Sequence, residues 1–209
     1  MKILFIDTET TGLSAKEGAN ELVQIGCHLT TGRGITESIS IKTQPVNWHR
    51  VDPKALEVTH LTKEILRSYP KPRESFNRFF TFIMKHWDGK NKLLIGGQNV
   101  KFDIRFTELW WNTWKNPEHP EFATVFNVDD CYELQDLTRE LKKLGILVVD
   151  NVKLGTVANA LMITPEGELH DAMTDIDLTH KVMFSIIDRV KMLNNEDLNQ
   201  KFGKYMKLS

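Results

Sequence analysis

The stretch K-I-L-F-I-D-T-E-T-T-G at residues 2–12 decides the fold class and contains the first candidate site. Lys2–Ile6 is a short apolar run that ends in polar residues, a pattern typical of a buried strand. Side chains alternate along a strand, so Asp7 and Glu9 point to the same face. Two such carboxylates repel each other and are costly to desolvate, unless both are solvated at the strand end. A divalent cation with oxygen ligands, magnesium or manganese, removes this cost.

A second polar cluster follows the apolar run Leu93–Ile95, where a strand is expected to give way to a helix. Asn99 and Asp103 lie four residues apart and share one face of such a helix. The alternative is structural. Asn99 then caps the helix, and Asp103 is stabilised by the helix dipole in the first turn.

A third cluster, H-D-A-M-T-D at residues 170–175, opens a long amphipathic segment. Asp171 or Thr174 is a candidate cap for the helix. Taken singly, Asp175 reads as a surface acid and His170 as a loop residue. The three clusters gain meaning only in combination.

The rest of the chain predicts an α/β or α+β domain with one mixed sheet. Residues 21–30 and 35–41 alternate like two strands of a hairpin around the turn at 31–34. Further strands are expected at 93–95 and 125–128. Helices are expected at 73–87, 102–114, 134–144, 154–161 and 172–193. We predict one domain at 1–193 and a basic helical extension at 194–209, with Lys201, Lys204 and Lys207 on one face.

Aromatic residues are concentrated in the helix expected at 102–114. Phe106, Trp110 and Trp114 recur every four residues, which is typical of a face that packs in the core. Base stacking is the alternative role for this stripe. Trp111 lies off the stripe and is expected to be exposed.

Composition limits the function classes. The chain has 209 residues, 41% hydrophobic and 26% charged, which is typical of a globular protein. The net charge of −1 argues against binding to nucleic acid through wholesale positive charge. The apolar stretch at the N-terminus is too short for a signal peptide, and no run suits a membrane span. We therefore expect a cytoplasmic protein without membrane partners, in which Cys27 and Cys131 stay reduced.

In this order and at these intervals, the three clusters resemble the three motifs of the DEDDh 3′–5′ exonuclease superfamily. This DnaQ-like group includes the proofreading subunit of the bacterial replicative polymerase and ribonuclease T. The histidine five residues before the last acid, His170 before Asp175, is typical of the DEDDh branch. The resemblance covers roughly residues 2–190. Gln98 departs from it, because relatives often have histidine there.

The resemblance implies a ribonuclease H-like fold: a five-stranded mixed sheet with one antiparallel strand, flanked by helices. It implies a metal-dependent 3′–5′ exonuclease that hydrolyses phosphodiester bonds and releases 5′-mononucleotides. Asp7, Glu9, Asp103 and Asp175 would hold two divalent cations, Mg²⁺ or Mn²⁺. His170 would act as the general base.

The resemblance also implies contacts to the substrate. Thr10, Leu13, Asn99 and Phe102 would meet the terminal nucleotides, although core packing is the alternative for Leu13 and Phe102. His60 lies in a segment similar to one that contacts nucleotide in relatives, with Thr59 in place of the usual histidine.

Single-stranded DNA is the favoured substrate. The alternatives are an exoribonuclease that trims RNA 3′ ends and a catalytically silent nucleic-acid-binding or polymerase accessory module. A DNA polymerase partner and a homodimer are left open by the sequence.

Overall fold

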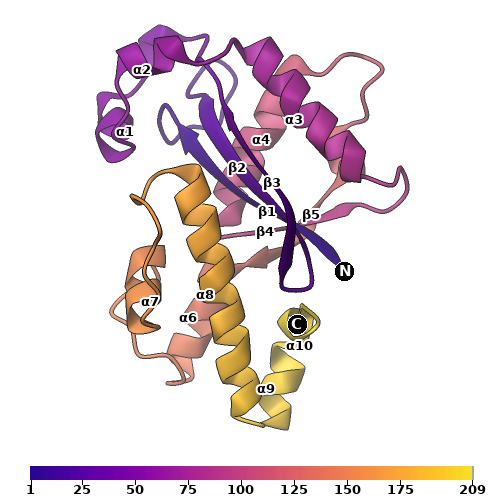
Figure 1. The fold of residues 1–209 in the computed structure, drawn as a ribbon, viewed down its shortest axis with the longest axis vertical. Coiled ribbons are helices and arrows are strands. Elements are labelled where there is room, and N and C mark those ends of the chain that lie inside the picture. Colours follow the sequence, from indigo (N-terminus) through magenta and orange to yellow (C-terminus); the bar gives the residue numbers. More distant parts are fainter. Residues whose placement is uncertain (209) are drawn as a thin grey trace.

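The computed structural model describes residues 1–208 and is built around one five-stranded sheet (Figure 1). The strands are β1 Lys2–Thr10, β2 Leu22–Thr31, β3 Gly34–Lys42, β4 Leu93–Gly97 and β5 Phe126–Glu133. Their order is β3-β2-β1-β4-β5, and β2 runs antiparallel to both of its neighbours. The pairs β1–β4 and β4–β5 are parallel. The predicted mixed sheet with one antiparallel strand is confirmed.

Helices cover both faces of this sheet (Figure 1). One core lies between the sheet and α3 and α4; the other lies between the sheet and α6, α7 and α8. The helices are η1 Trp48–Arg50, α1 Pro53–Val58, α2 Lys63–Ser68, α3 Pro72–His86, α4 Val100–Trp114, α5 Phe122–Val125, α6 Leu134–Lys143, α7 Leu154–Ala160, α8 Ala172–Met192, α9 Glu196–Lys201 and α10 Gly203–Met206.

The central strand β1 contributes to both cores. On one face of the strand, Leu4 and Ile6 pack into the α3–α4 core. On the other face, Ile3 and Phe5 pack into the α6–α8 core. Because side chains alternate, Asp7 and Glu9 continue the face of Ile3 and Phe5, toward α8. Thr8 faces the side of α4. The alternation of β1 therefore decides which helix each polar side chain at its end can meet.

Helix α4 is buried on more sides than its sequence indicates. The prediction that Trp111 is exposed is wrong: the side chain is fully buried, and its Nε1 donates to the Pro120 carbonyl at 3.0 Å. The indole packs against Phe76 of α3 on one side and Phe126 of β5 on another. A helix held between two elements buries more than one face, which a single stripe does not reveal. Phe106 and Trp110 of the predicted stripe are buried as expected.

The last described residues pack against the domain. Phe202 and Leu208 are buried in the α6–α8 core. Lys201 pairs with Glu140 at 3.1 Å, and Lys204 pairs with Asp130 at the end of β5. The division between 1–193 and 194–209 stays a prediction, and residue 209 lies outside the described residues.

The sequence also led to expectations about the two cysteines and about membrane-spanning segments. Both cysteines, Cys27 and Cys131, are buried and unpaired. Across residues 1–208, no helix combines the length and the apolar character that crossing a membrane requires.

Candidate active site

The candidate site lies at the carboxyl end of β1, where the first turns of α4 and α8 meet it (Figure 1). Asp7 and Glu9 come from β1, and Asp103 comes from the first turn of α4. Asp175 lies in the first turn of α8, and His170 lies just before that helix. The structure thus brings residues from three distant segments to one end of the central strand.

Three of these side chains form a group that fits a metal ion. Ligand atoms of Glu9, His170 and Asp175 all lie within 4.8 Å of one another. The His170 backbone N–H donates to Asp175 Oδ2 at 3.2 Å, whereas Asp175 Oδ1 is buried without a hydrogen-bond partner. A buried carboxylate oxygen without a partner is unusual in a folded protein, and a cation would satisfy it. The donor set of carboxylate oxygens and an imidazole suits a divalent cation.

Asp103 approaches the site from the other side of β1. Its Oδ1 accepts two hydrogen bonds from Thr8, from the backbone N–H at 2.8 Å and from Oγ1 at 2.7 Å. Thr8 makes these contacts because it faces α4, opposite to Asp7 and Glu9. No local pattern indicates this role of Thr8, since its partner lies 95 residues away in the sequence.

The carboxylates raise one another's pKa values. Desolvation, then repulsion by Asp175 and Asp103, raises the pKa of Glu9 to about 9. Desolvation raises the pKa of Asp103 to about 8, against the opposing effect of the Thr8 hydrogen bonds. Desolvation, then repulsion by Asp103 and Glu9, raises the pKa of Asp7 well above its usual range. Without a cation, this cluster retains protons at neutral pH.

These shifts predict an unusual pH dependence of stability. In the unfolded chain the same carboxyls ionise near pH 4, whereas Glu9 and Asp103 keep their protons to about pH 9 and pH 8 in the fold. The folded state thus binds more protons, so the free energy of unfolding falls as pH rises toward these pKa values. The slope is on the order of 1 kcal/mol per pH unit for each retained proton.

Thermal unfolding in chelator and in Mn²⁺ between pH 7 and pH 9 measures this effect. The melting temperature should fall with pH in chelator, and the stabilisation by Mn²⁺ should grow with pH. This window avoids the buried His180, whose pKa desolvation lowers to about 4 and which therefore affects stability mainly in acid. A melting temperature in chelator that does not change with pH would contradict the prediction.

The start of α8 is held against β2. Asp171 caps the helix through two backbone N–H groups, as one reading of the sequence predicted, and Gln24 Nε2 donates to its Oδ2 at 2.9 Å. Gly26 lies beneath this turn, and a Cβ at that position would lie 2.7 Å from the Ala172 carbonyl oxygen. Only glycine allows β2 and α8 to approach so closely. This contact fixes the first turn that carries Asp175.

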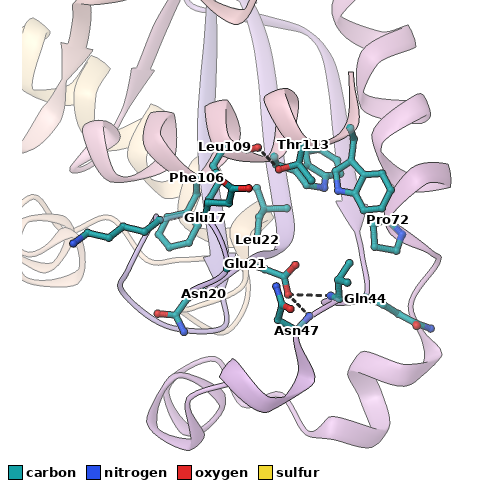
Figure 2. A pocket seen from close by; sticks show the side chains of 15 residues that line it. Glu17, Asn20, Glu21, Leu22, Gln44, Asn47, Pro72, Phe106, Leu109 and Thr113 are labelled. Atoms are coloured by element: carbon teal, nitrogen blue, oxygen red, sulfur yellow. Dashed lines mark hydrogen bonds between the residues drawn. The ribbon is translucent and has the colours of Figure 1, made fainter. Parts of the chain in front are cut away.

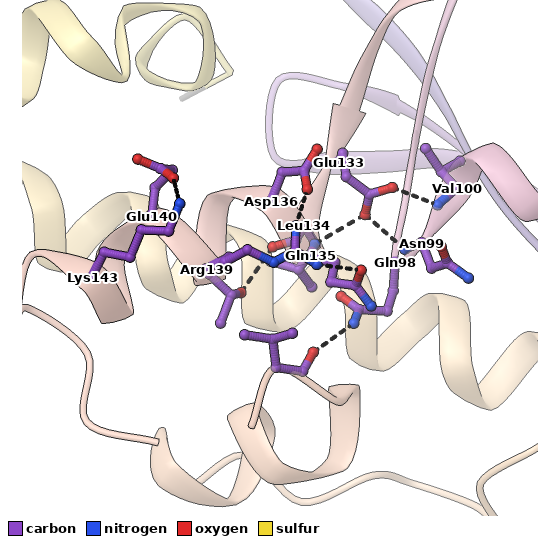
Figure 3. Close-up of polar contacts among 12 residues, drawn as sticks. Gln98, Asn99, Val100, Glu133, Leu134, Gln135, Asp136, Arg139, Glu140 and Lys143 are labelled. Carbon is purple, nitrogen blue, oxygen red and sulfur yellow. Dashed lines mark hydrogen bonds and ion pairs between the residues drawn. The ribbon is translucent and has the colours of Figure 1, made fainter. Parts of the chain in front are cut away.

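The start of α4 is held by a residue that the sequence did not indicate (Figure 3). Asn99 occupies the N-cap position, but its side chain forms no capping bond, so the structural alternative for this residue is wrong. Instead, the Glu133 carboxylate accepts the backbone N–H groups of Asn99 at 2.7 Å, Val100 at 2.8 Å and Gln135 at 3.0 Å. Glu133 therefore joins the starts of α4 and α6. It was missed because the predicted strand ended at 128, whereas pairing with β4 extends β5 to Glu133 itself.

The predicted substrate contacts are placed in different environments. Thr10 is buried, and its Oγ1 donates to the Gly12 carbonyl at 2.6 Å. Leu13 is 85% exposed, so core packing does not explain it. Phe102 is half-buried, and its ring lies 4.8 Å from that of Phe106. Their roles toward a nucleotide stay predictions.

The other two predicted contacts, His60 and Asn99, lie on different elements. His60 lines a cavity of about 180 Å³ together with His170 and Asp171. Asn99 has a left-handed backbone, with φ at 57°, directly before α4. These positions leave both side chains as candidates for contact with a substrate.

Solved structures of exonuclease I share this fold. The Escherichia coli enzyme in complex with a dT13 oligonucleotide superposes with a TM-score of 0.71 at 19% identity, over 96% of this chain and 45% of that one. Its zinc-bound complex with single-stranded DNA gives a TM-score of 0.74 at 19% identity, over 97% of this chain and 43% of that one. Exonuclease I from Methylocaldum szegediense gives a TM-score of 0.72 at 21% identity, over 97% of this chain and 43% of that one. The chain spans less than half the length of these relatives.

Sequence comparison gives the family directly. No curated protein sequence matches the chain. The Exonuclease family model (RNase_T) matches residues 4–183, which is most of the chain. Because this match contains all three motifs, the chain belongs to the exonuclease family, as a DEDDh-type, DnaQ-like member.

Proposed function

We propose that this protein is a divalent-metal-dependent 3′–5′ exonuclease that releases 5′-mononucleotides from the 3′ end of nucleic acid. The observation that carries the proposal is the meeting of Glu9, His170 and Asp175 within 4.8 Å. Two further acids lie close by, since desolvation and then repulsion by Asp103 raise the pKa of Asp7. Family membership makes phosphodiester hydrolysis the chemistry that this arrangement fits best.

Each residue has a distinct role in this proposal. Asp7, Glu9, Asp103 and Asp175 hold two divalent cations, Mg²⁺ or Mn²⁺. When bound, such a pair stabilises negative charge on the attacking and leaving oxygens. His170 is exposed beside the carboxylates and accepts the proton of the attacking water. Its backbone N–H meanwhile orients Asp175.

Single-stranded DNA is the proposed substrate. The E. coli exonuclease I structures contain dT13 and dA13 oligonucleotides. Because the present chain shares their fold, these complexes support DNA rather than RNA as its substrate. Leu13 is exposed and Phe102 partly so, and apolar and aromatic groups of this kind contact bases with little sequence preference. A polymerase partner and a homodimer are kept only as predictions from the sequence.

Digestion of 5′-labelled single-stranded DNA and RNA of one sequence tests the proposal. With Mg²⁺ or Mn²⁺ we expect a ladder that shortens from the 3′ end, faster on DNA, and no cleavage in chelator. Faster digestion of RNA would instead identify a 3′-end trimming exoribonuclease. Retention of the strand without cleavage would identify a binding or accessory module.

We call the three hydrogen bonds that the Glu133 carboxylate accepts from Asn99, Val100 and Gln135 the Glu133 clamp. Its loss should reduce the activity, although Glu133 touches no reacting group. Glu133→Gln has only one oxygen to accept N–H groups and presents an amide donor to the others. We expect the free energy of unfolding to fall by about 1–3 kcal/mol. Cation affinity and hydrolysis should fall by about tenfold or more, because the start of α4 carries Asp103. Mn²⁺ titration and initial rates measure both effects.

Asp136→Asn is the matched control for Glu133→Gln. Asp136 is exposed in the first turn of α6 and pairs with Arg139, so the substitution removes one carboxylate nearby without touching α4. Glu133→Asp keeps the carboxylate and should recover part of the cation affinity. Equal cation affinity in Glu133→Gln and Asp136→Asn would show that the clamp does not position Asp103.

A further inference from the structure

We propose that a base of the substrate strand, 5′ to the nucleotide being removed, binds in an aromatic pocket along the second half of α4. This inference deepens the proposed exonuclease function and rests on it. The pocket has a volume of about 380 Å³, within the usual range of ligand sites. Phe106, Leu109, Trp110 and Thr113 line it from α4, and Glu21 and Leu22 line it from the start of β2. Figure 2 shows the α4 side chains on one side and Glu21 on the other.

Trp110 provides a rigid aromatic part of the pocket wall. Trp110 is 7% exposed, and its Nε1 is buried without an acceptor. Buried donors in folded proteins are nearly always paired, so this unpaired N–H is an exception within the core behind the pocket wall. The indole ring itself is held in place by Phe76 and Phe79, at centroid distances of 5.5 and 5.6 Å.

The opposite wall supplies an acceptor. Glu21 Oε2 accepts the backbone N–H groups of Val46 at 2.9 Å and Asn47 at 2.7 Å, which fixes the carboxylate in place. Its second oxygen is left for a donor group. A nucleobase combines a flat π-system with ring acceptors and amino donors, and stacks on aromatic side chains. This combination matches the aromatic walls and the Glu21 acceptor.

A second cavity adjoins this pocket and is lined by Leu13, which follows the first motif in the sequence. It has a volume of about 470 Å³ and is lined by Leu13, Arg105, Lys16 and Asn20, among others. Lys16 and Asn20 line both cavities. Within residues 1–208, neither Lys16 nor Arg105 forms an ion pair with a carboxylate. Free cations beside an aromatic pocket are the pattern of single-strand binding, with phosphates on the cations and bases on the rings.

Helix α4 connects the two parts of this path. Asp103 lies in its first turn, Phe106 follows one turn later in the pocket wall, and Thr113 lies near its end. A base can enter the pocket only if it is unpaired. The path therefore selects single strands that are long enough to reach the pocket, with little dependence on sequence.

Filling the pocket tests the inference. Thr113 is exposed at the pocket, so Thr113→Phe adds a ring there with little risk to the fold. Asn112→Phe is the matched control, because Asn112 is exposed on the same helix but does not line the pocket. Relative to the wild type, Thr113→Phe should raise the KM for a DNA strand of about 12 nucleotides about tenfold more than the KM for a dinucleotide. Asn112→Phe should leave both KM values unchanged.

The salt dependence of KM tests the role of the cationic side chains separately. Arg105→Gln should reduce the slope of log KM against log salt concentration by about 0.7 for the longer strand, as expected for one lost phosphate contact on a single strand. An unchanged slope would remove Arg105 from the path. Equal KM values for Thr113→Phe and Asn112→Phe on the longer strand would overturn the pocket as a base site.

A binding measurement separates this inference from the proposed function. The base analogue 2-aminopurine, placed at successive positions of the longer strand, should be quenched at one position by the wild type and not by Thr113→Phe. Quenching at no internal position would overturn the inference. If the wild type hydrolyses neither substrate, the proposed function fails, and the quenching pattern still decides whether the pocket holds a base.

Discussion

Replacing Asp175 by asparagine is expected to reduce hydrolysis of single-stranded DNA roughly 100- to 1,000-fold, because a bound cation contributes several kcal/mol to the barrier. Asp175 Oδ1 is buried and unpaired, and the hydrogen bond that Oδ2 accepts from the His170 backbone N–H can also be accepted by the amide oxygen of asparagine. Asparagine keeps the size of the side chain and removes one charge from a repelling cluster. The metal-free variant should therefore melt no lower than the wild type, whereas its stabilisation by Mn²⁺ should shrink.

The matched control for this variant is Asp177→Asn. Asp177 lies two residues further along α8 and pairs with Lys181 at 2.6 Å, away from the acid cluster. It should keep both the rate and the response to Mn²⁺. Initial rates and thermal unfolding with and without Mn²⁺ provide the comparison. Substantial hydrolysis by Asp175→Asn would remove Asp175 from the reacting centre.

Replacing His170 is expected to cost about 100-fold or more in rate, the usual contribution of a positioned general base. Cation binding should persist, because the four carboxylates proposed to hold the cations remain, and the backbone N–H that contacts Asp175 is retained by any residue. The backbone of His170 is left-handed, with φ at 69°. Asparagine tolerates this conformation better than alanine, so His170→Asn should be measured beside His170→Ala.

The pH–rate profile distinguishes a base from a structural residue. Wild-type activity should fall in mild acid, because a protonated imidazole cannot accept a proton. The residual activity of both His170 variants should lose this acid limb. His49→Ala, at an exposed position in η1, is the control and should retain the wild-type profile. A wild-type rate in His170→Asn at neutral pH would exclude the role of general base.

Local patterns in the sequence were sufficient for much of the fold. The apolar run before Asp7 and the alternating residues of β2 and β3 predicted the strands, because strand alternation is a property of neighbouring residues. The same alternation placed Asp7 and Glu9 on one face. The five-stranded sheet, implied by the resemblance, is confirmed by its observed topology.

The sequence also named the residues that the structure brings together at the end of β1. Glu9 was predicted from the first motif and His170 and Asp175 from the third, and all three lie within 4.8 Å of one another. The motifs succeed because each occupies the end of a strand or the start of a helix, and such positions are recognisable locally. The catalytic roles of these residues stay predictions until they are measured.

What surrounds the site depended on tertiary structure. Thr8 meets Asp103 across 95 residues of sequence, and Glu133 meets Asn99 across 34. Neither pair follows from local periodicity, because the sheet alone brings these segments together. The length of β5, which delivers Glu133, is set by its pairing with β4 rather than by its own composition.

Burial followed the same division. Trp111 lies off the apolar stripe of its helix, yet it is buried because α4 is enclosed by α3 and β5. The unpaired N–H of Trp110 likewise becomes visible only once its neighbours are in place. By itself, the sequence determined that the three motifs lie near the ends of strands and the starts of helices, since such positions are recognisable locally. Only the tertiary structure decided which backbone and side-chain groups hold those ends in place, since hydrogen bonds between distant segments form only in the folded chain.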